Sequence, residues 1–192
     1  MGRPRKFDEE VAVEAALEVF WAKGFEATST EDLCARTGLG RGSLYNTFRS
    51  KANLYQQALR RYAELGHAAQ AEILHGPGSA KERLRALLTA VIDHDLNDPE
   101  HRGCLAVNAA SDAAGRTDEV AAEVRTQFTR IEGMLHDVIL AGQRAGEITT
   151  DRDARQLARS FLAGYYGLRV LAKVVHDRAA LVDVLEGTLA AL

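Results

Sequence analysis

The stretch TEDLCARTGLGRGSLYNTFRSKANLY, residues 30–55, combines small, hydroxyl and basic residues in one helix-forming run. Ser29 and Asp32 have the spacing of a capping box, which predicts a helix that begins here and stops near Gly38. A second short helix is predicted from about Arg41 to Phe48. Two short helices joined by a tight glycine-containing turn have the spacing of a helix-turn-helix, whose second helix enters the major groove of DNA.

A helix that lies in the groove needs small residues where its backbone approaches DNA closely, and Gly42 and Ser43 meet this need. It also needs a phenol and cations at its edges, here Tyr45, Arg41 and Lys51. Because a cation in the first turn of a helix opposes the helix dipole, Lys51 is expected to have an anion nearby. A DNA phosphate would be such an anion.

Outside this stretch the chain shows the periodicity of helices, with three prolines and no alternating β-branched segment. We therefore predict an all-α fold. The expected helices run from Asp8 to Gly24, from a cap at Ser50 toward Leu74, from Ser79 to Leu96 and onward from about Cys104. Two long amphipathic helices and a short helix over residues 178–192 complete the chain.

Charge is unevenly distributed along the 192 residues, whose net charge is −3. Through Tyr62 there are ten Lys or Arg against eight Asp or Glu, and the remainder has fourteen against nineteen. Only the front third is therefore basic. We find no membrane span and no export signal, and Cys34 and Cys104 lack CxxC spacing, so a reducing cytoplasmic location is expected. Without a P-loop, GxSxG or HExxH motif, neither an enzyme nor a cofactor is predicted.

The segment AALEVFWAKGFEATSTEDLCARTGL followed by GRGSLYNTFRSKANLY, residues 15–55, resembles the tetracycline-repressor (TetR) family of transcription regulators. The resemblance implies a three-helix DNA-binding domain over residues 1–50 and a helical ligand-binding and dimerisation domain over residues 51–192. Gly40 departs from the Ser or Thr that the family usually has at this cap, and it is a weaker but permitted cap. The DNA-contacting set that the resemblance implies comprises Thr30, Arg41, Gly42, Ser43, Tyr45, Asn46, Thr47 and Lys51.

The N-terminal segment MGRPRKFD has two interpretations. Basic residues before a first helix are often only a solvated terminus. Alternatively, the segment resembles arms that enter the minor groove, where proline keeps the chain extended and arginines reach the bases. In that interpretation Arg3, Arg5 and Lys6 contact DNA.

The rear two thirds of the chain is expected to form a dimer, because one helix-turn-helix reads only half of a symmetric site. The last two helices would supply a four-helix interface. Its candidate residues, which would equally suit a core within one chain, are Leu157, Phe161, Gly164, Leu168, Leu171, Leu181, Leu185 and Leu189.

A ligand pocket lined by the fourth to eighth helices is implied by the family resemblance. Polar or aromatic residues amid apolar stripes are the candidates, although each alone is more often a core or surface residue. The set comprises Cys104, Asn108, Gln127, Phe128, His136, Tyr165, Tyr166 and Arg169.

Cys104 lies in the segment RGCLAVNAA, where Gly103 is expected to precede a helix start. The helix dipole and the neighbouring Arg102 would both favour the thiolate. The segment resembles TetR-like regulators with Gly-Cys-Leu here, some of which sense electrophiles through this cysteine. The alternative is a small residue that packs beneath the pocket.

The loop DHDLNDPEHRGC also collects potential metal ligands. They are Asp93, His94, Asp95, Asp98, His101 and Cys104. Without paired cysteines or a tight histidine spacing, no metal site is predicted.

The predicted function is a ligand-responsive transcription regulator, a repressor that leaves a palindromic operator when a small molecule binds. Its partners would be double-stranded operator DNA, an unidentified small-molecule inducer and a second copy of the chain, without a membrane. The alternative is a DNA-organising or partner-binding protein that uses the same fold without an inducer.

Overall fold

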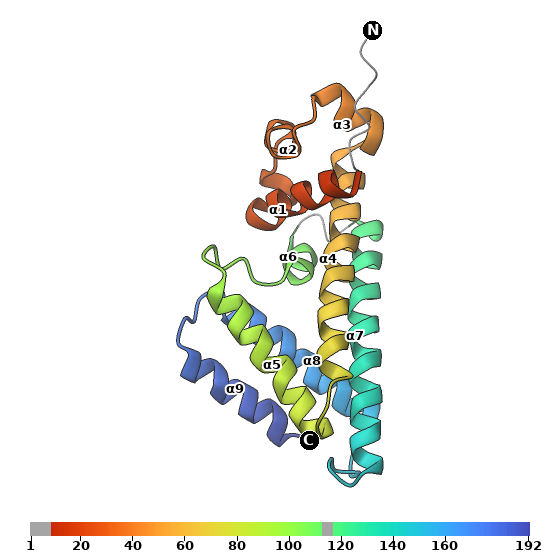
Figure 1. Cartoon of the computed structure of the whole chain (residues 1–192), viewed down its shortest axis with the longest axis vertical. Helices are drawn as coiled ribbons and strands as arrows, with labels where there is room; N and C mark the ends of the chain where they lie inside the picture. The colour runs from red at the N-terminus through yellow and green to blue at the C-terminus, as the bar shows by residue number, and fades with distance from the viewer. Residues whose placement is uncertain (1–8, 113–116) are drawn as a thin grey trace.

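A computed structural model describes residues 9–112 and 117–192, and these residues form nine α-helices and no strand (Figure 1). The prediction of an all-α fold is confirmed. None of the described helices is both long and apolar enough to cross a lipid bilayer. The helices are α1 (Glu9–Ala27), α2 (Thr30–Thr37), α3 (Arg41–Phe48), α4 (Lys51–Leu74), α5 (Ala80–Asn97), α6 (Leu105–Ser111), α7 (Asp118–Arg144), α8 (Ala154–Leu171) and α9 (Arg178–Ala190).

Local signals set the boundaries of α2 and α3 as predicted, whereas Asp8, the expected cap of α1, lies outside the described residues. Ser29 and Asp32 form the complete capping box of α2, and Gly38 ends that helix in the left-handed conformation with φ 71°. Gly40 caps α3 without a side-chain hydrogen bond. In α1, Gly24 has φ 76° and breaks the regular helix, as expected, but one further turn reaches Ala27.

The apolar residues form two clusters, one at each end of the molecule. The first cluster joins α1, α2 and α3 to residues of α4, α6 and α7, including Leu54, Leu105 and Val124. The three-helix unit therefore packs on elements beyond residue 50. In Figure 1, α1 to α3 form one end and the long helix α4 runs from them along α7. The domain boundary at residue 50 stays a prediction.

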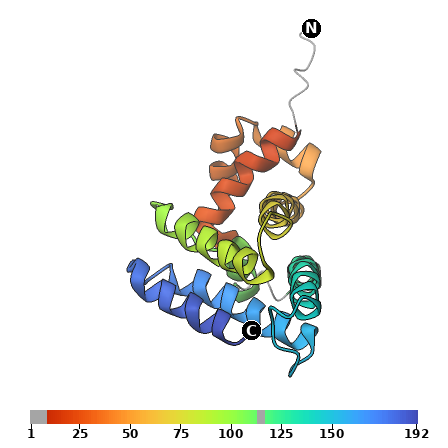
Figure 2. The same ribbon diagram turned by 60° about the horizontal axis from the view of Figure 1, so that its bottom comes forward.

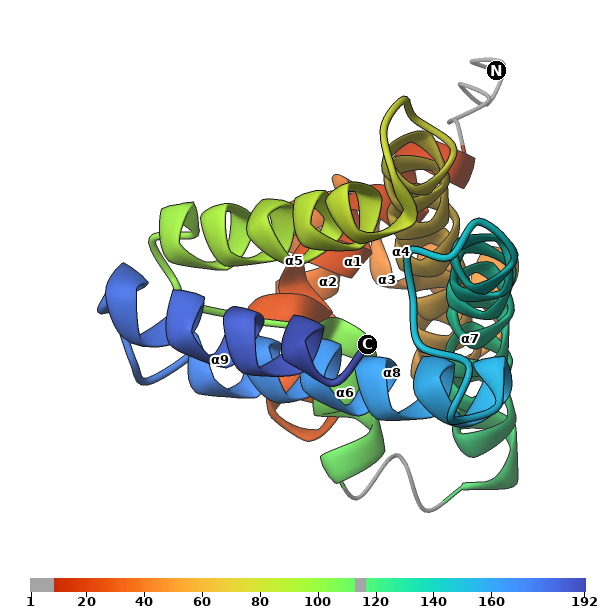
Figure 3. The same ribbon diagram turned by 90° about the horizontal axis from the view of Figure 1, so that it is seen from below.

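The second cluster holds α5, α7, α8 and α9 together. Helices α8 and α9 pack on each other and α5 packs on α9, as the views from below show (Figures 2 and 3). Of the proposed interface residues, six are at least 94 % buried within the single chain. They belong to the chain's own core, so the alternative interpretation is the correct one. These six are Leu157, Phe161, Leu168, Leu181, Leu185 and Leu189.

The remaining two interface candidates differ from each other. A Cβ at Gly164 would lie 2.7 Å from the Thr188 hydroxyl, so this glycine permits close packing of α8 on α9 of the same chain. Leu171 is 39 % exposed. It remains available to a partner.

Candidate nucleic-acid interface and ligand cavity

Helix α3 has one buried and one exposed face. Leu44 and Phe48 anchor it in the first apolar cluster, with exposed fractions of 0 % and 1 %. The opposite face exposes Arg41, Gly42, Ser43 and Asn46. No protein atom lies within 4 Å of the position where Gly42 would carry a Cβ, so its backbone is open to close approach. Four of the predicted contact residues thus share one solvent-facing surface.

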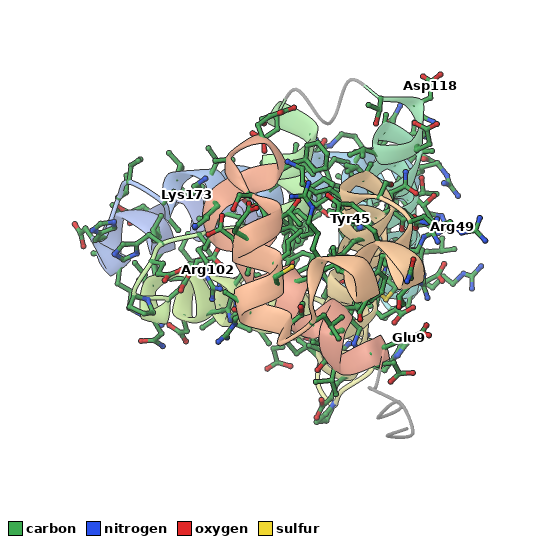
Figure 4. The ribbon with its side chains drawn as sticks, turned by 90° about the horizontal axis from the view of Figure 1, so that it is seen from above. Glu9, Tyr45, Arg49, Arg102, Asp118 and Lys173 are labelled. Atoms are coloured by element: carbon green, nitrogen blue, oxygen red, sulfur yellow. The ribbon has the colours of Figure 1, made fainter. Side chains whose placement is uncertain are left out.

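Tyr45 and Thr30 join α3 to the start of α2. Their hydroxyl oxygens lie 2.8 Å apart, and both side chains are half-buried. The hydrogen bond holds the phenol at the end of the molecule formed by α1 to α3, the end seen in Figure 4. Thr47, the neighbour of Asn46, is also half-buried. These positions are compatible with the contacts that the sequence predicts.

Lys51 has partners inside the protein. Its Nζ donates to the carbonyl oxygens of Phe25 and Thr28, each at 2.9 Å, and lies 4.4 Å from the centre of the Phe25 ring. Carbonyl groups in the last turn of α1 and just after it therefore supply the negative partner that the sequence argument assigned to a phosphate alone. An ammonium has three donors, so one remains for a phosphate oxygen.

Two further cations lie outside the predicted set of DNA-contacting residues. Arg49, which caps α3 with φ 64°, is exposed at the same end of the molecule and is labelled in Figure 4. Arg36 is exposed in the last turn of α2. Their basic character is visible in the sequence, but their exposure depends on packing. Arg3, Arg5 and Lys6 lie outside the described residues.

A small cavity between α4, α6, α7 and α8 contains five of the eight predicted ligand residues. Its volume is about 40 Å³, which is room for only a few water molecules. The five residues, which come from distant parts of the chain, are Cys104, Gln127, Tyr165, Tyr166 and Arg169.

The cavity residue Arg169 belongs to a buried ion pair. The Arg169 guanidinium donates to both carboxylate oxygens of Asp95, at 2.8 and 3.0 Å, and the two side chains are 8 % and 2 % exposed. Arg169 also donates to the Tyr62 hydroxyl at 3.1 Å and to the Gly103 carbonyl at 3.4 Å. One side chain of α8 therefore joins α4, α5 and the loop before α6.

Tyrosine and glutamine side chains complete the polar lining. Gln70 donates to the Tyr165 hydroxyl at 3.0 Å, and Gln127 donates to the carbonyl of Leu59 at 3.1 Å. Burial raises the pKa of Tyr62 well above its usual value and raises the pKa of Tyr165 as well. Both phenols therefore stay protonated at neutral pH.

Three predicted ligand residues lie away from this lining. Phe128 was expected in the buried stripe of α7, but its neighbour Gln127 is buried there instead, and Phe128 packs on Tyr166 with ring centres 4.4 Å apart. Asn108 bonds to the Arg102 carbonyl and the Lys173 ammonium, each at 2.9 Å. The His136 ring lies 3.0 Å from Asp137 at the surface.

The surroundings of Cys104 differ from the sequence expectation. Cys104 is the N-cap of α6 and is 3 % exposed, but the neighbouring Arg102 is engaged by Asp98 at 3.1 Å and Glu18 at 2.7 Å. The cation in the cavity with Cys104 is Arg169, 65 residues further along the chain. The Arg102 charge is therefore paired with carboxylates, and its predicted effect on the thiol stays a prediction.

The potential metal ligands of residues 93–104 have other partners in the structure. Asp95 pairs with Arg169, Asp98 pairs with Arg102, and the His101 ring stacks on His176 with centres 3.9 Å apart. Within residues 9–112 and 117–192, no group of three or more His, Cys, Asp or Glu side chains is placed to hold a metal ion.

One carbonyl connects the cavity to α1. The Gly103 oxygen accepts from Trp21 Nε1 at 3.0 Å and from Arg169 at 3.4 Å. The Arg102 guanidinium lies 4.1 Å from the centre of the Trp21 ring and pairs with Glu18 of the same helix. The cavity wall is therefore hydrogen-bonded to α1, and α1 packs on α2.

The fold defines a helix-turn-helix DNA-binding protein with a helical second part. The model of the bacterial regulatory proteins of the tetR family matches residues 12–58, and that of the tetracyclin repressor-like C-terminal domain matches residues 80–187. The chain therefore belongs to the tetR family of transcriptional regulators, which are DNA-binding proteins rather than enzymes.

The similarity to known proteins covers nearly the whole chain. The HTH-type transcriptional regulator YezE of Bacillus subtilis is 33% identical, with 100% of both chains covered. The HTH-type transcriptional repressor ComR of Escherichia coli is 27% identical over 90% of this chain and 82% of its own. The solved structure of a cysteine mutant of the regulator CifR with 26-base-pair operator DNA has a TM-score of 0.87 and 30% identity, with 99% of each chain covered.

Proposed function

We propose that the chain is a homodimeric repressor that leaves a palindromic operator when a small molecule binds in its C-terminal half. The observation that carries this proposal is the connection of two features through Gly103. The first feature is the solvent-facing surface of α3, which suits DNA. The second is the buried polar cavity, whose residue Arg169 shares the Gly103 carbonyl with Trp21 of α1. Such a protein would act in the cytoplasm, at the chromosome.

The DNA-binding surface in this proposal comprises the eight predicted residues of α2, α3 and α4. Arg41, Ser43 and Asn46 read or flank the bases, while Tyr45 and Lys51 bind phosphates. The CifR structure, which contains operator DNA, supports a common docking mode for this fold. Residues 1–50 would form the DNA-binding domain and residues 51–192 the ligand-binding and dimerisation domain.

The dimer would use the outer face of α8 rather than its buried leucines. Val170 and Leu171 are 48 % and 39 % exposed, and Val174 just after the helix is 77 % exposed. Gly167 on the same helix has open space beside it, which permits close approach of a second copy. Exposed apolar residues grouped in this way are typical of an interface.

A ligand would act on the cavity of Cys104, Gln127, Tyr165, Tyr166 and Arg169 or on its walls. Asn108, Phe128 and His136 would contribute only after rearrangement, because they lie outside the lining. The chain's alternative function, DNA organisation without an inducer, would give many dispersed genomic sites and no ligand effect. Mapping the bound genomic DNA distinguishes the two, since a repressor occupies a few palindromic sites.

We expect Tyr45→Phe and Lys51→Ala each to weaken binding to all operator variants about equally, because phosphate contacts carry no base information. Loss of the Lys51 charge should reduce the salt dependence of log K by about one unit. Fluorescence anisotropy over a series of salt concentrations measures both effects.

The matched control is Lys81→Ala, an exposed lysine of α5 near the other end of the molecule. Because Lys51 also bonds to Phe25 and Thr28, the thermal midpoint of each variant must be compared at the same time. An unchanged salt slope in a folded Lys51→Ala variant would contradict the proposed docking.

Deletion of residues 1–6 tests the proposed minor-groove arm of Arg3, Arg5 and Lys6. We expect lower affinity, mainly for operators with A·T-rich flanks, where the minor groove is narrow and attracts arginine. Operators with A·T-rich and G·C-rich flanks are compared in the full-length and shortened proteins. If the shortened protein binds each operator as tightly as the full-length protein does, the arm is a solvated terminus. An equal loss of affinity for the two operators would contradict the preference for a narrow A·T minor groove.

A further inference from the structure

A second and larger hollow lies beside the small cavity. It has a volume of about 440 Å³, within the range of about 300–1,000 Å³ typical of small-molecule sites, whereas the cavity with Cys104 has about 40 Å³. Tyr62, Gln70, Tyr165 and Arg169 line both spaces and so form a common wall. We call the larger space the α1–α4–α5 cleft, because residues of these three helices supply its other sides.

The lining of the α1–α4–α5 cleft is mainly apolar. Leu65 borders the cleft and is 50 % exposed, so the apolar lining is open to solvent at this side. Gln70 and His94 add hydrogen-bonding groups. The principal apolar side chains are Leu17 and Trp21 from α1, Leu65 and Ile73 from α4, and Leu87 and Val91 from α5.

The carboxylate and guanidinium groups that line the cleft are already paired. Glu18 bonds to Arg102 at 2.7 Å, and Arg169 bonds to Asp95 at 2.8 Å. A charged ligand would lose its hydration on entering the cleft, and no unpaired carboxylate or guanidinium of the lining would form an ion pair with it. The cleft therefore favours an uncharged molecule.

We infer that the α1–α4–α5 cleft binds an uncharged, mainly apolar small molecule, and that this molecule contacts the DNA-binding end of the protein directly. The inference rests on the proposed function for its regulatory meaning, but not for the binding itself. Trp21 is the central contact. It lines the cleft, packs on Tyr62 with ring centres 5.0 Å apart and bonds to the Gly103 carbonyl at 3.0 Å.

The test uses Trp21, which is the only tryptophan of the chain, as the donor for energy transfer to a bound probe. The uncharged probe is N-phenyl-1-naphthylamine, and its anionic counterpart is 8-anilino-1-naphthalenesulfonate. We expect saturable quenching of Trp21 with one uncharged probe per chain, and affinity for the sulfonate at least about tenfold weaker. Equal or tighter binding of the sulfonate, or no saturable transfer, would overturn the inference.

Two neighbouring alanines of α4 provide a matched pair of variants. Both are exposed, but only Ala69 lines the cleft, whereas Ala68 does not. Ala69→Phe should fill the space and lower the affinity for the uncharged probe at least about tenfold, while Ala68→Phe should stay within about twofold of the unmodified protein. Equal effects of both substitutions would place the probe elsewhere, and circular dichroism checks that both variants fold.

Operator binding is measured separately with the same proteins. If Ala69→Phe abolishes probe binding, the site is supported even when the probe does not release operator DNA from the unmodified protein. A failure to release DNA would count only against the proposed ligand response. Conversely, the uncharged probe could release operator DNA equally from the unmodified and Ala69→Phe proteins. That result would support a ligand response but contradict this cleft as its site.

Discussion

The Asp95→Ala variant is expected to lose about 3–5 kcal/mol of its free energy of unfolding, because the Arg169 guanidinium is left buried without its counter-ion. The remaining partners of Arg169 are the neutral Tyr62 hydroxyl and the Gly103 carbonyl, which cannot neutralise its charge. Such a loss is a large part of the stability of a typical domain. Chemical denaturation at neutral pH measures it.

Asp93→Ala is the matched control for this prediction. Asp93 is on the same helix two residues earlier, and its ion pair with Arg178 has the same type of groups at 3.1 Å. Those side chains are 49 % and 54 % exposed, so the loss should be only about 0–1 kcal/mol. Similar losses in both variants would show that burial does not govern the Asp95 pair. Replacing both Asp95 and Arg169 by leucine should recover part of the stability.

Alkylation of Cys104 is expected to lower operator affinity at least about tenfold, because an adduct cannot fit in a cavity of about 40 Å³ without moving its wall. Gly103 precedes this cysteine, and its carbonyl bonds to Trp21 of α1. Displacement of the loop would therefore disturb the support of α2 and α3. Anisotropy before and after N-ethylmaleimide treatment, with mass spectrometry of the adduct, measures the effect.

Single cysteine variants separate the two thiols. Cys34 is half-buried in α2 and Cys104 is buried, so both sites must be followed independently. After treatment, Cys34→Ser should still release DNA and Cys104→Ser should retain it. Release that persists in Cys104→Ser would exclude Cys104 as the sensor, although the assignment to the tetR family would remain.

Several structural elements could be predicted because their causes are local in the chain. The Ser29 capping box, the left-handed Gly38 and the alternation of buried Leu44 with exposed Ser43 each depend on residues within one or two turns. Family resemblance then added the expected DNA-facing residues. These stay predictions, since their contacts require a DNA molecule.

Packing decided which partner each polar side chain uses. Lys51 bonds to carbonyls that are 23 and 26 residues away, and Arg102 turns from its neighbour Cys104 toward Glu18, 84 residues away. Amphipathic periodicity correctly indicated buried leucines in α8 and α9, but it cannot tell a core within one chain from an interface between two. Only the arrangement of the helices made that distinction.

The sequence by itself determined the all-α fold, the limits of α2 and the helix-turn-helix, because capping, glycine conformation and apolar periodicity act over a few residues. The tertiary structure alone decided the Asp95–Arg169 pair, which joins residues 74 apart, and the cleft that α1 shares with α4 and α5. Neither has a local signal. Both arise because burial of apolar helix faces brings distant side chains together, and a buried charge is stable there only beside its counter-ion.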